Sequence, residues 1–304
     1  FGDHNNGQIW TLDWEGLSTP VRTPFLTVPP GNKWNGLSGF GTDHNNELYI
    51  MLLGTSGTIQ KIVRNGGGAQ APALLSQTGA FSDLATLTPD AALVPYTLNS
   101  PLWSDGAAKS RWIAVPNDGT PYGPTERVTF SATGEWSYPV GTVIVKHFEL
   151  PVDETNPASL TRLETRFLVR TAGDWYGVTY RWRLDGTDAD LIYGSETRDI
   201  TIATEGGGSR VQQWYFPGRT DCMQCHNKNS GEVLGLHTWQ LNGDMTYPTT
   251  GRTDNQLSTW SAIELFDQTL SPTQIAGFLR SVPVDDASAS LETRMRSYVD
   301  ANCS

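Results

Sequence analysis

Basic residues are scarce in this sequence, and long apolar runs are absent. The 21 Lys and Arg residues against 32 Asp and Glu residues give a formal net charge of −11. Nucleic acid is therefore a poor partner, because phosphate binding needs a basic face. An acidic surface is compatible with a basic electron-transfer partner, although it more often serves solubility alone. No stretch has enough consecutive apolar residues to span a bilayer, so we expect no membrane span.

The sequence also lacks an initial methionine and a signal peptide. It begins at Phe1 within a strand-like pattern and stops within a pattern typical of a helix. We therefore expect a fragment shortened at both ends, and any argument for export must come from its chemistry.

Turn-forming residues and tryptophan are abundant. The 31 Gly and 18 Pro residues favour many turns and short strands over long helices. Eleven Trp residues suit half-buried sheets or a flat ligand such as a porphyrin. A chain of 304 residues is long enough for two domains. We therefore predict a mainly β protein.

The N-terminal part contains an internal repeat. DHNNGQIWTL (3–12) and DHNNELYIML (43–52) align without a gap, and each combines a polar turn with an alternating strand. A third strand is expected at 57–63. A period of forty residues with short strands is typical of propeller blades, but one and a half blades cannot close a propeller. We therefore predict a propeller-blade remnant at 1–66, followed by a Gly-, Ala- and Pro-rich linker at 67–94.

The two DHNN turns could also bind calcium. Asp3 with Asn5, or Asp43 with Asn45, would be the ligands. The turns lack the glycine and the terminal glutamate of the standard calcium loop, so turn chemistry is favoured.

Residues 95–242 are predicted to form an antiparallel β-sandwich or a curved single sheet. In 175–184, the alternation places Tyr176, Val178, Tyr180, Trp182 and Leu184 on one face. In 162–170, it places Leu163, Thr165, Phe167 and Val169 on one face and Arg162, Glu164, Arg166 and Arg170 on the other. The segment 142–150 is more evenly apolar, which predicts a central strand.

Residues 243–304 are predicted to be loop and short helices. In 271–282, Ser271 is the expected N-cap, Pro272 opens the helix and Gln274 closes a capping box. An apolar stripe of Ile275, Phe278, Leu279 and Val282 would pack inward. In 290–303, the corresponding stripe is Leu291, Met295, Tyr298 and Val299.

The segment TDCMQCHNKNSGEVLGL (220–236) carries the strongest chemical signal. C-x-x-C-H is the attachment signature of c-type haem. Cys222 and Cys225 would form thioethers with the two vinyl groups, and His226 would be the proximal ligand of the iron. With only one other cysteine in the chain, the motif is much less ambiguous than its length suggests.

Two other interpretations of the motif remain open. A zinc site could use Cys222 and Cys225 with His226 and His237, but adjacent cysteine and histidine ligands suit a tetrahedral site poorly. A redox dithiol or a disulfide expects a βαβ context, which the pattern lacks.

The sixth ligand of a haem iron is not determined by the sequence. The candidates are His147, His237, Met223, Met245 and Met295. Each also has an ordinary role in packing or at the surface, so an empty or water-filled sixth position is a further possibility.

Six segments together resemble a family of exported bacterial haem proteins. They are SPLWSDGAAKSRWIAVP (100–116), PVGTVIVKHFEL (139–150), LETRFLVR (163–170), WYGVTYRWRLDGTDADL (175–191), FPGRTDCMQCHNKNSGEVLGLHTWQLN (216–242) and RSYVDANC (296–303). Members of this family often follow a propeller similar to glucose/sorbosone dehydrogenase. The segments FGDHNNGQIWTL (1–12) and FGTDHNNELYIMLLGTSGTIQKIV (40–63) resemble the last blades of that quinoprotein propeller.

The resemblance implies several further features. Any quinone cofactor and dehydrogenase active site would lie upstream of Phe1. Cys303 would be the first cysteine of a second haem motif that continues after Ser304 into a small cytochrome c domain. The sheet also resembles, more weakly, β-sheet mono-haem cytochromes in which some members cross-link a lysine to the porphyrin. For Lys146 we expect a solvated strand position instead.

The sequence thus predicts a periplasmic or secreted protein with one covalent haem c. We expect an electron-transfer role, with electrons accepted from a linked sugar or alcohol dehydrogenase-like propeller or passed to a redox partner protein. One alternative is a haem enzyme or gas sensor with an open sixth position. Another is a β-sandwich without haem that binds carbohydrate through its aromatic faces.

Overall fold

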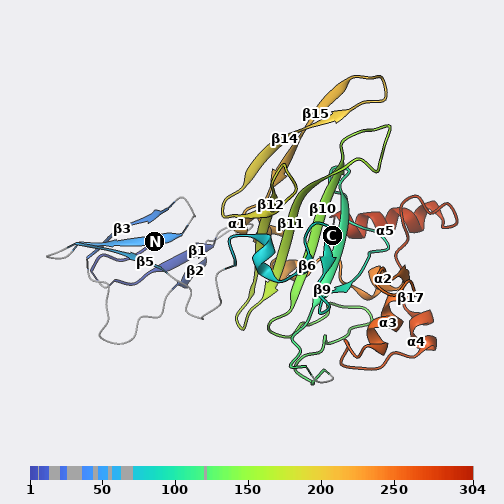
Figure 1. Ribbon diagram of the computed structural model, residues 1–304. Helices are drawn as coiled ribbons and strands as arrows, with labels where there is room; N and C mark the ends of the chain where they lie inside the picture. Colours follow the sequence, from blue (N-terminus) through green and yellow to red (C-terminus); the bar gives the residue numbers. More distant parts are fainter. Residues whose placement is uncertain are drawn as a thin grey trace. The chain divides into compact units, whose positions relative to one another are not determined.

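The computed structural model describes residues 1–5, 7–13, 21–25, 36–43, 47–53, 57–62, 71–119 and 122–303 (Figure 1). The chain divides into two compact units, Phe1–Ala69 and Gln70–Ser304. Each unit is described by itself below.

The first unit consists of two small antiparallel sheets. Strand β1 (Trp10–Asp13) pairs with β2 (Val21–Pro24). Strand β3 (Leu37–Thr42) pairs with β4 (Leu48–Leu52), which pairs with β5 (Thr58–Lys61).

Each aspartate of the two DHNN segments accepts a hydrogen bond from the backbone of a residue that follows it closely in the chain. The Asp3 carboxylate accepts a hydrogen bond from the backbone N–H of Asn5 at 2.8 Å. The Asp43 carboxylate accepts one from the backbone N–H of Glu47 at 3.0 Å. These bonds are the turn chemistry that the sequence favoured over calcium ligation. Asn45 lies outside the described residues.

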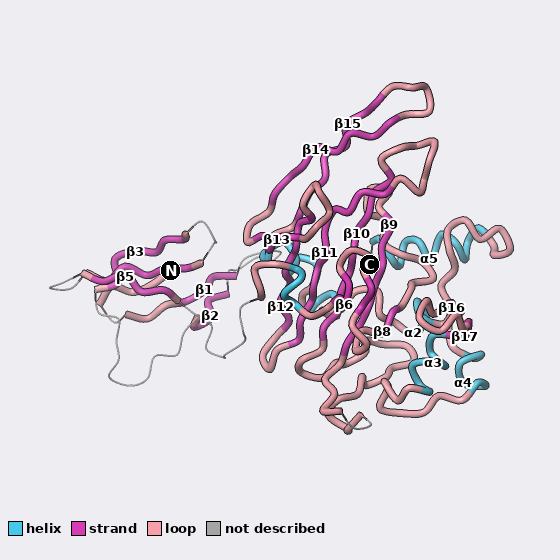
Figure 2. The backbone as a smooth tube through the Cα atoms, in the orientation of Figure 1, coloured by secondary structure: helices cyan, strands magenta, loops and turns pink. Residues whose placement is uncertain are grey.

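The second unit is built on one antiparallel sheet of six strands, in the order β13-β12-β11-β10-β9-β8 (Figure 2). Its strands are β8 (Val94–Pro95), β9 (Ala108–Ala114), β10 (Val143–Pro151), β11 (Leu160–Arg170), β12 (Trp175–Trp182) and β13 (Ala189–Ile192). Strand β10 lies between β9 and β11. The prediction of a central strand at 142–150 is therefore confirmed, and so is the mainly β, antiparallel character of the fold.

One face of this sheet is covered by the segment 71–94. Its elements are η1 (Leu75–Thr78), β6 (Phe81–Asp83) and β7 (Thr88–Pro89), and it leads into the edge strand β8. Leu75, Ala80 and Leu93 pack with the sheet residues Trp112, Val145, Phe167, Val178, Tyr180 and Trp182. The linker expected at 67–94 is therefore wrong for the described residues 71–94, because apolar residues within the Gly- and Pro-rich segment contribute to the core.

The other face of the sheet carries the CMQCH segment, and we call it the motif face. At one end it packs against the hairpin of β14 (Glu196–Ala203) and β15 (Ser209–Phe216), through Ile202, Trp214 and Phe216. At the other end Ile113, Ile144 and Leu168 pack with Trp136, Trp260 and Phe266 from the loops and helices. The second layer is thus a hairpin and helical segments, where the sequence predicted either a sandwich or a single sheet.

A β-bulge changes which face of the sheet the side chains of β11 lie on. The pairing with β10 shifts between Phe148 and Glu149, so that Phe148 pairs with Glu164 and Glu149 pairs with Arg162. Leu163 therefore packs with the hairpin cluster on the motif face, and the Arg162 guanidinium lies 4.7 Å from the Trp182 ring centre. The strict alternation predicted for 162–170 is wrong at these two residues, because a bulge adds one residue to the count.

Short helices and one small hairpin follow the sheet. They are α1 (Arg219–Cys225), η2 (Lys228–Ser230), α2 (Thr238–Leu241), β16 (Asp244–Thr246), β17 (Thr253–Asn255), α3 (Gln256–Ala262), α4 (Pro272–Gly277) and α5 (Leu291–Cys303). Ser271 caps α4 with Gln274 as predicted. The helix ends at Gly277, so the stripe expected to run through Leu279 is wrong, and Leu279 is 70% exposed.

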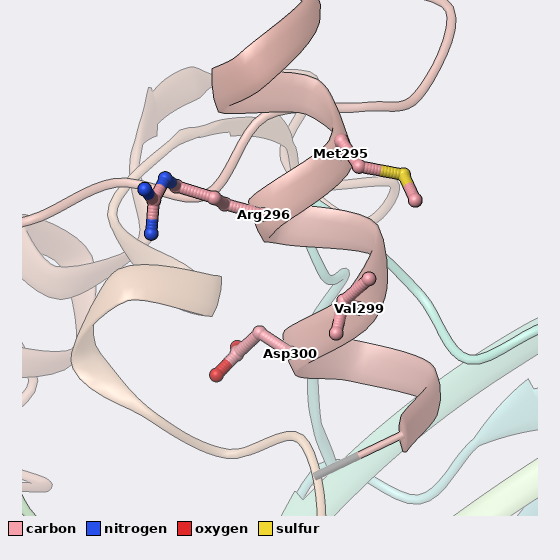
Figure 3. Close-up of a pocket in the computed structure, with 4 residues that line it drawn as sticks. All are labelled: Met295, Arg296, Val299 and Asp300. Carbon is pink, nitrogen blue, oxygen red and sulfur yellow. The ribbon is translucent and has the colours of Figure 1, made fainter.

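Helix α5 has its predicted bounds but not its predicted packing. The stripe of Leu291, Met295, Tyr298 and Val299 is exposed, with Leu291 at 74%. Met295 and Val299 line a surface hollow with Arg296 and Asp300 (Figure 3). Among the described residues, no helix has the length and apolar character that a membrane crossing requires.

Candidate functional site

Helix α1 is fixed to the end of strand β15 by its first residues. Gly218 is the N-cap, and its backbone N–H donates to the Asp221 carboxylate at 2.8 Å. The Tyr215 hydroxyl donates to the same carboxylate at 2.9 Å. A Cβ at Gly218 would lie 2.8 Å from the backbone of Gly194 and Ser195. A glycine at the N-cap therefore allows the helix to begin directly against the turn between β13 and β14.

The two thiols of the motif project from this helix. Cys222 and Cys225 are three residues apart, so their side chains lie on the same side of α1. Both thiols are free; Cys222 is half-buried and Cys225 is exposed. The Cys222 side chain lies against Gly177 of β12, where an added Cβ would be 2.6 Å from Cys222 Cβ and 2.8 Å from its Sγ. Burial raises the pKa of the Cys222 thiol.

His226 ends α1 and is held by the loop that follows. Its backbone N–H donates to the Cys222 carbonyl at 2.9 Å. Its Nδ1 lies 2.7 Å from the Glu232 carbonyl oxygen, which can only accept, so Nδ1 carries the proton. The Nε2 lone pair is then available to a ligand. Glu232, which the sequence did not single out, presents this carbonyl from a backbone with φ of 63°.

The electrostatic environment keeps His226 neutral. Burial, together with the positive charge of Lys146, lowers the pKa of the His226 imidazole to about 4. A neutral imidazole is the form that ligates metals. The loop is tied to the sheet by an ion pair between Arg170 and Glu232 at 3.7 Å.

Lys146 lies on the motif face, beside the thiols. In the register it is directly opposite Arg111 on β9 and Arg166 on β11. Burial first, and then the charges of Arg111 and Arg166, lower the pKa of Lys146 to about 7, while Cys222 and Cys225 act in the opposite direction. Lys146 is half-buried at this position, so the expectation of a solvated strand lysine holds only in part.

The two histidine candidates for the sixth ligand have other partners. His147 is fully buried on the opposite face, with Nδ1 2.8 Å from Thr165 Oγ1 and its ring edge-on to Trp182. His237 stacks on Trp239 at 4.5 Å and lies 3.5 Å from the Glu135 carboxylate.

The methionine candidates and the last cysteine have different surroundings. Met245 is half-buried in the hairpin β16–β17, opposite Asp254. Met223 packs against the larger core cluster beside Gly177, and Met295 is exposed on α5. Cys303 is exposed at the end of α5.

The donor set fits a covalent haem better than it fits a bare metal ion. Two reduced thiols on one side of a helix are followed at once by a neutral histidine with a free Nε2, which are the groups that c-type attachment uses. Across the described part of the chain, no three or more His, Cys, Asp or Glu side chains are grouped to hold a metal ion. Cys222, Cys225, His226 and His237 are thus not assembled as the zinc alternative requires.

Comparisons of this chain with protein-family models, with curated proteins and with solved structures found no match.

Proposed function

We propose that this protein is a c-type haem protein that transfers electrons, with its haem attached at Cys222 and Cys225 and ligated by His226. The observation that supports this most directly is the bond between His226 Nδ1 and the Glu232 carbonyl. Such a bond fixes the tautomer and the ring orientation of a ligating histidine and raises its basicity.

The chain's own residues would prepare the attachment. Gly177 lets the helix carrying Cys222 lie close to the sheet, and the Arg170–Glu232 pair restrains the loop that orients His226. A bound haem would supply a one-electron redox centre, whose potential depends on burial and on hydrogen bonding around it. We propose a periplasmic or secreted location, and a linked sugar or alcohol dehydrogenase-like module or a redox partner protein as the source of electrons.

A haem stain on a denaturing gel, with a pyridine haemochrome spectrum, tests this function. The protein would be exported in a host that carries cytochrome c maturation machinery, beside the variant Cys222→Ala/Cys225→Ala. We expect stain that survives denaturation in the unsubstituted protein and is absent from the variant. No stain in folded, exported protein would contradict the proposal.

A haem protein with an open sixth position is a second candidate. It is favoured by the position of His147 on the opposite face of the sheet and by the contacts of His237 with Trp239 and Glu135. A shift of the Soret band on adding carbon monoxide would support it, whereas a six-coordinate spectrum that does not respond would support electron transfer alone.

The carbohydrate-binding alternative has little support in the geometry. The sheet tryptophans that could form a flat binding platform are buried in the core: Trp112, Trp175, Trp182 and Trp214.

A further inference from the structure

Three cations form a row across the motif face of the sheet. Lys146 on β10 is directly opposite Arg111 on one side and Arg166 on the other. Residues directly opposite on adjacent antiparallel strands are separated by about 5 Å and project to the same face. Arg111, Lys146 and Arg166 therefore place three basic side chains next to one another, and we call them the cationic row.

The row has too few carboxylates for its charge. Glu164 is fully buried and pairs with the Arg166 guanidinium, with Nε 2.9 Å from Oε2. In the described residues, no carboxylate lies within ion-pair distance of Arg111 or Lys146. Arg111 is only 7% exposed, and among the described residues its guanidinium bonds only to the Lys109 carbonyl, at 3.3 Å.

This arrangement is costly without a further partner. A buried charge with no counter-charge is strongly destabilising, and neighbouring like charges add repulsion. A polar atom without a partner lies next to the row as well. The Tyr96 hydroxyl is buried without a hydrogen bond in the described structure, and the Tyr96 backbone N–H donates to the Arg111 carbonyl at 3.0 Å, which places the two residues side by side.

We propose that the cationic row, with the Tyr96 hydroxyl at its edge, is an anion-binding site that takes a carboxylate or an oxyanion. Guanidinium and ammonium groups hold such anions through charge-assisted hydrogen bonds, and a phenol can add a donor. The anion has two sources: the carboxylates of a haem attached at Cys222 and Cys225, or a small free anion bound next to the motif. Only the first source rests on the proposed function.

Inorganic phosphate is a suitable probe for this site. The haem-free full chain, Cys222→Ala/Cys225→Ala, would be unfolded by heat while its tryptophan fluorescence is followed, in phosphate and in sodium chloride of equal ionic strength. We expect phosphate to raise the unfolding midpoint by several degrees in a saturable manner, because it binds only the folded state.

Three further substitutions in the Cys222→Ala/Cys225→Ala protein test whether phosphate binds at the cationic row. Lys146→Gln and Arg111→Gln should each weaken phosphate binding by roughly tenfold or more. Each should also raise the midpoint in buffer without phosphate, because a cation without a counter-charge is removed, half-buried at Lys146 and buried at Arg111. Lys228→Gln is the matched control, since Lys228 is exposed in the loop after the motif and should leave both readouts unchanged. Phosphate stabilisation no greater than that of chloride, or equal binding by all three variants, would overturn the proposal.

The same measurements on the haem-loaded protein then show whether the anion is a haem carboxylate or a free anion. If phosphate still stabilises it saturably through Lys146, the ligand is a free anion. If phosphate has no effect and Lys146→Gln lowers its midpoint relative to Lys228→Gln, the haem carboxylates occupy the row. If phosphate has no effect and Lys146→Gln does not lower the midpoint, the proposal is wrong.

The remaining outcomes are also decisive. If the Cys222→Ala/Cys225→Ala protein does not fold, the proposal is tested only by comparing Lys146→Gln with Lys228→Gln in haem-loaded protein. A lower unfolding midpoint for Lys146→Gln then supports the site. Should the chain take up no haem, the proposed function fails, and the unsubstituted protein still tests the row with phosphate.

Discussion

Gly177 shows how one residue can position the whole motif. The residue lies on β12, and the side chain of Cys222 occupies the space where a Cβ would be. Thr179 is directly opposite Arg166 in the register. The alternation of the strand places Gly177 on the same face as Thr179. The approach of helix and sheet at this point therefore requires a residue without a side chain.

The variant Gly177→Ala tests this contact. We expect it to destabilise the folded protein by about 1–3 kcal/mol, because the added methyl group must displace α1 or the sheet. It should also reduce the yield of stained haem protein, since Cys222 would move. The free energy of unfolding would be measured by urea denaturation.

The matched control is Gly173→Ala. Gly173 is exposed in the turn before β12, and a Cβ added there would have no atom within 4 Å. This change should alter the free energy of unfolding by no more than about 0.5 kcal/mol. Equal effects of the two substitutions would contradict the proposed role of the contact.

Helix α5 is held by polar contacts. Ser297 is 6% exposed, and its hydroxyl accepts a hydrogen bond from the backbone N–H of Val282 at 3.0 Å. The Ser297 carbonyl accepts one from the Ser100 hydroxyl at 3.1 Å, and the Asn302 side chain accepts one from the backbone N–H of Trp103 at 2.8 Å. The helix therefore docks through the face that its sequence marks as polar.

This docking gives an unusual expectation for substitutions in α5. Ser297→Ala should cost about 1–3 kcal/mol, because the partly buried N–H of Val282 loses its acceptor. Leu291→Ala, on the apolar stripe, should change the free energy of unfolding by at most about 0.5 kcal/mol. Denaturant unfolding of both variants measures the difference. A larger loss from Leu291→Ala would mean that the stripe is buried in solution.

The whole molecule consists of two units with separate cores. Ile9, Leu37 and Ile50 form the core of the first unit. All three larger hydrophobic clusters lie within Gln70–Ser304. Because a domain with its own core can fold by itself, the second unit should not need the first.

The fragment Gln70–Ser304 tests that independence. We expect it to unfold cooperatively, with a midpoint within a few degrees of the corresponding transition in the whole chain. Differential scanning calorimetry of both proteins would show this. A fragment that binds a hydrophobic dye and has no cooperative transition would contradict it.

The sequence by itself determined the features that depend on near neighbours. The evenly apolar run predicted the strand at 142–150, and the period of two in 175–184 predicted β12. The capping pattern at Ser271 predicted the start of α4. These features follow from backbone geometry within a few residues, which a local pattern records directly.

Only the tertiary structure decided what each of those elements faces. Alternation puts Lys146 and His147 on opposite faces, but which face the motif covers depends on Gly177, a residue far away in the sequence. The bulge at Leu163 and the exposed stripe of α5 depend in the same way on distant partners. Burial is a property of contacts between segments, and a period along one segment cannot report which segment will cover it.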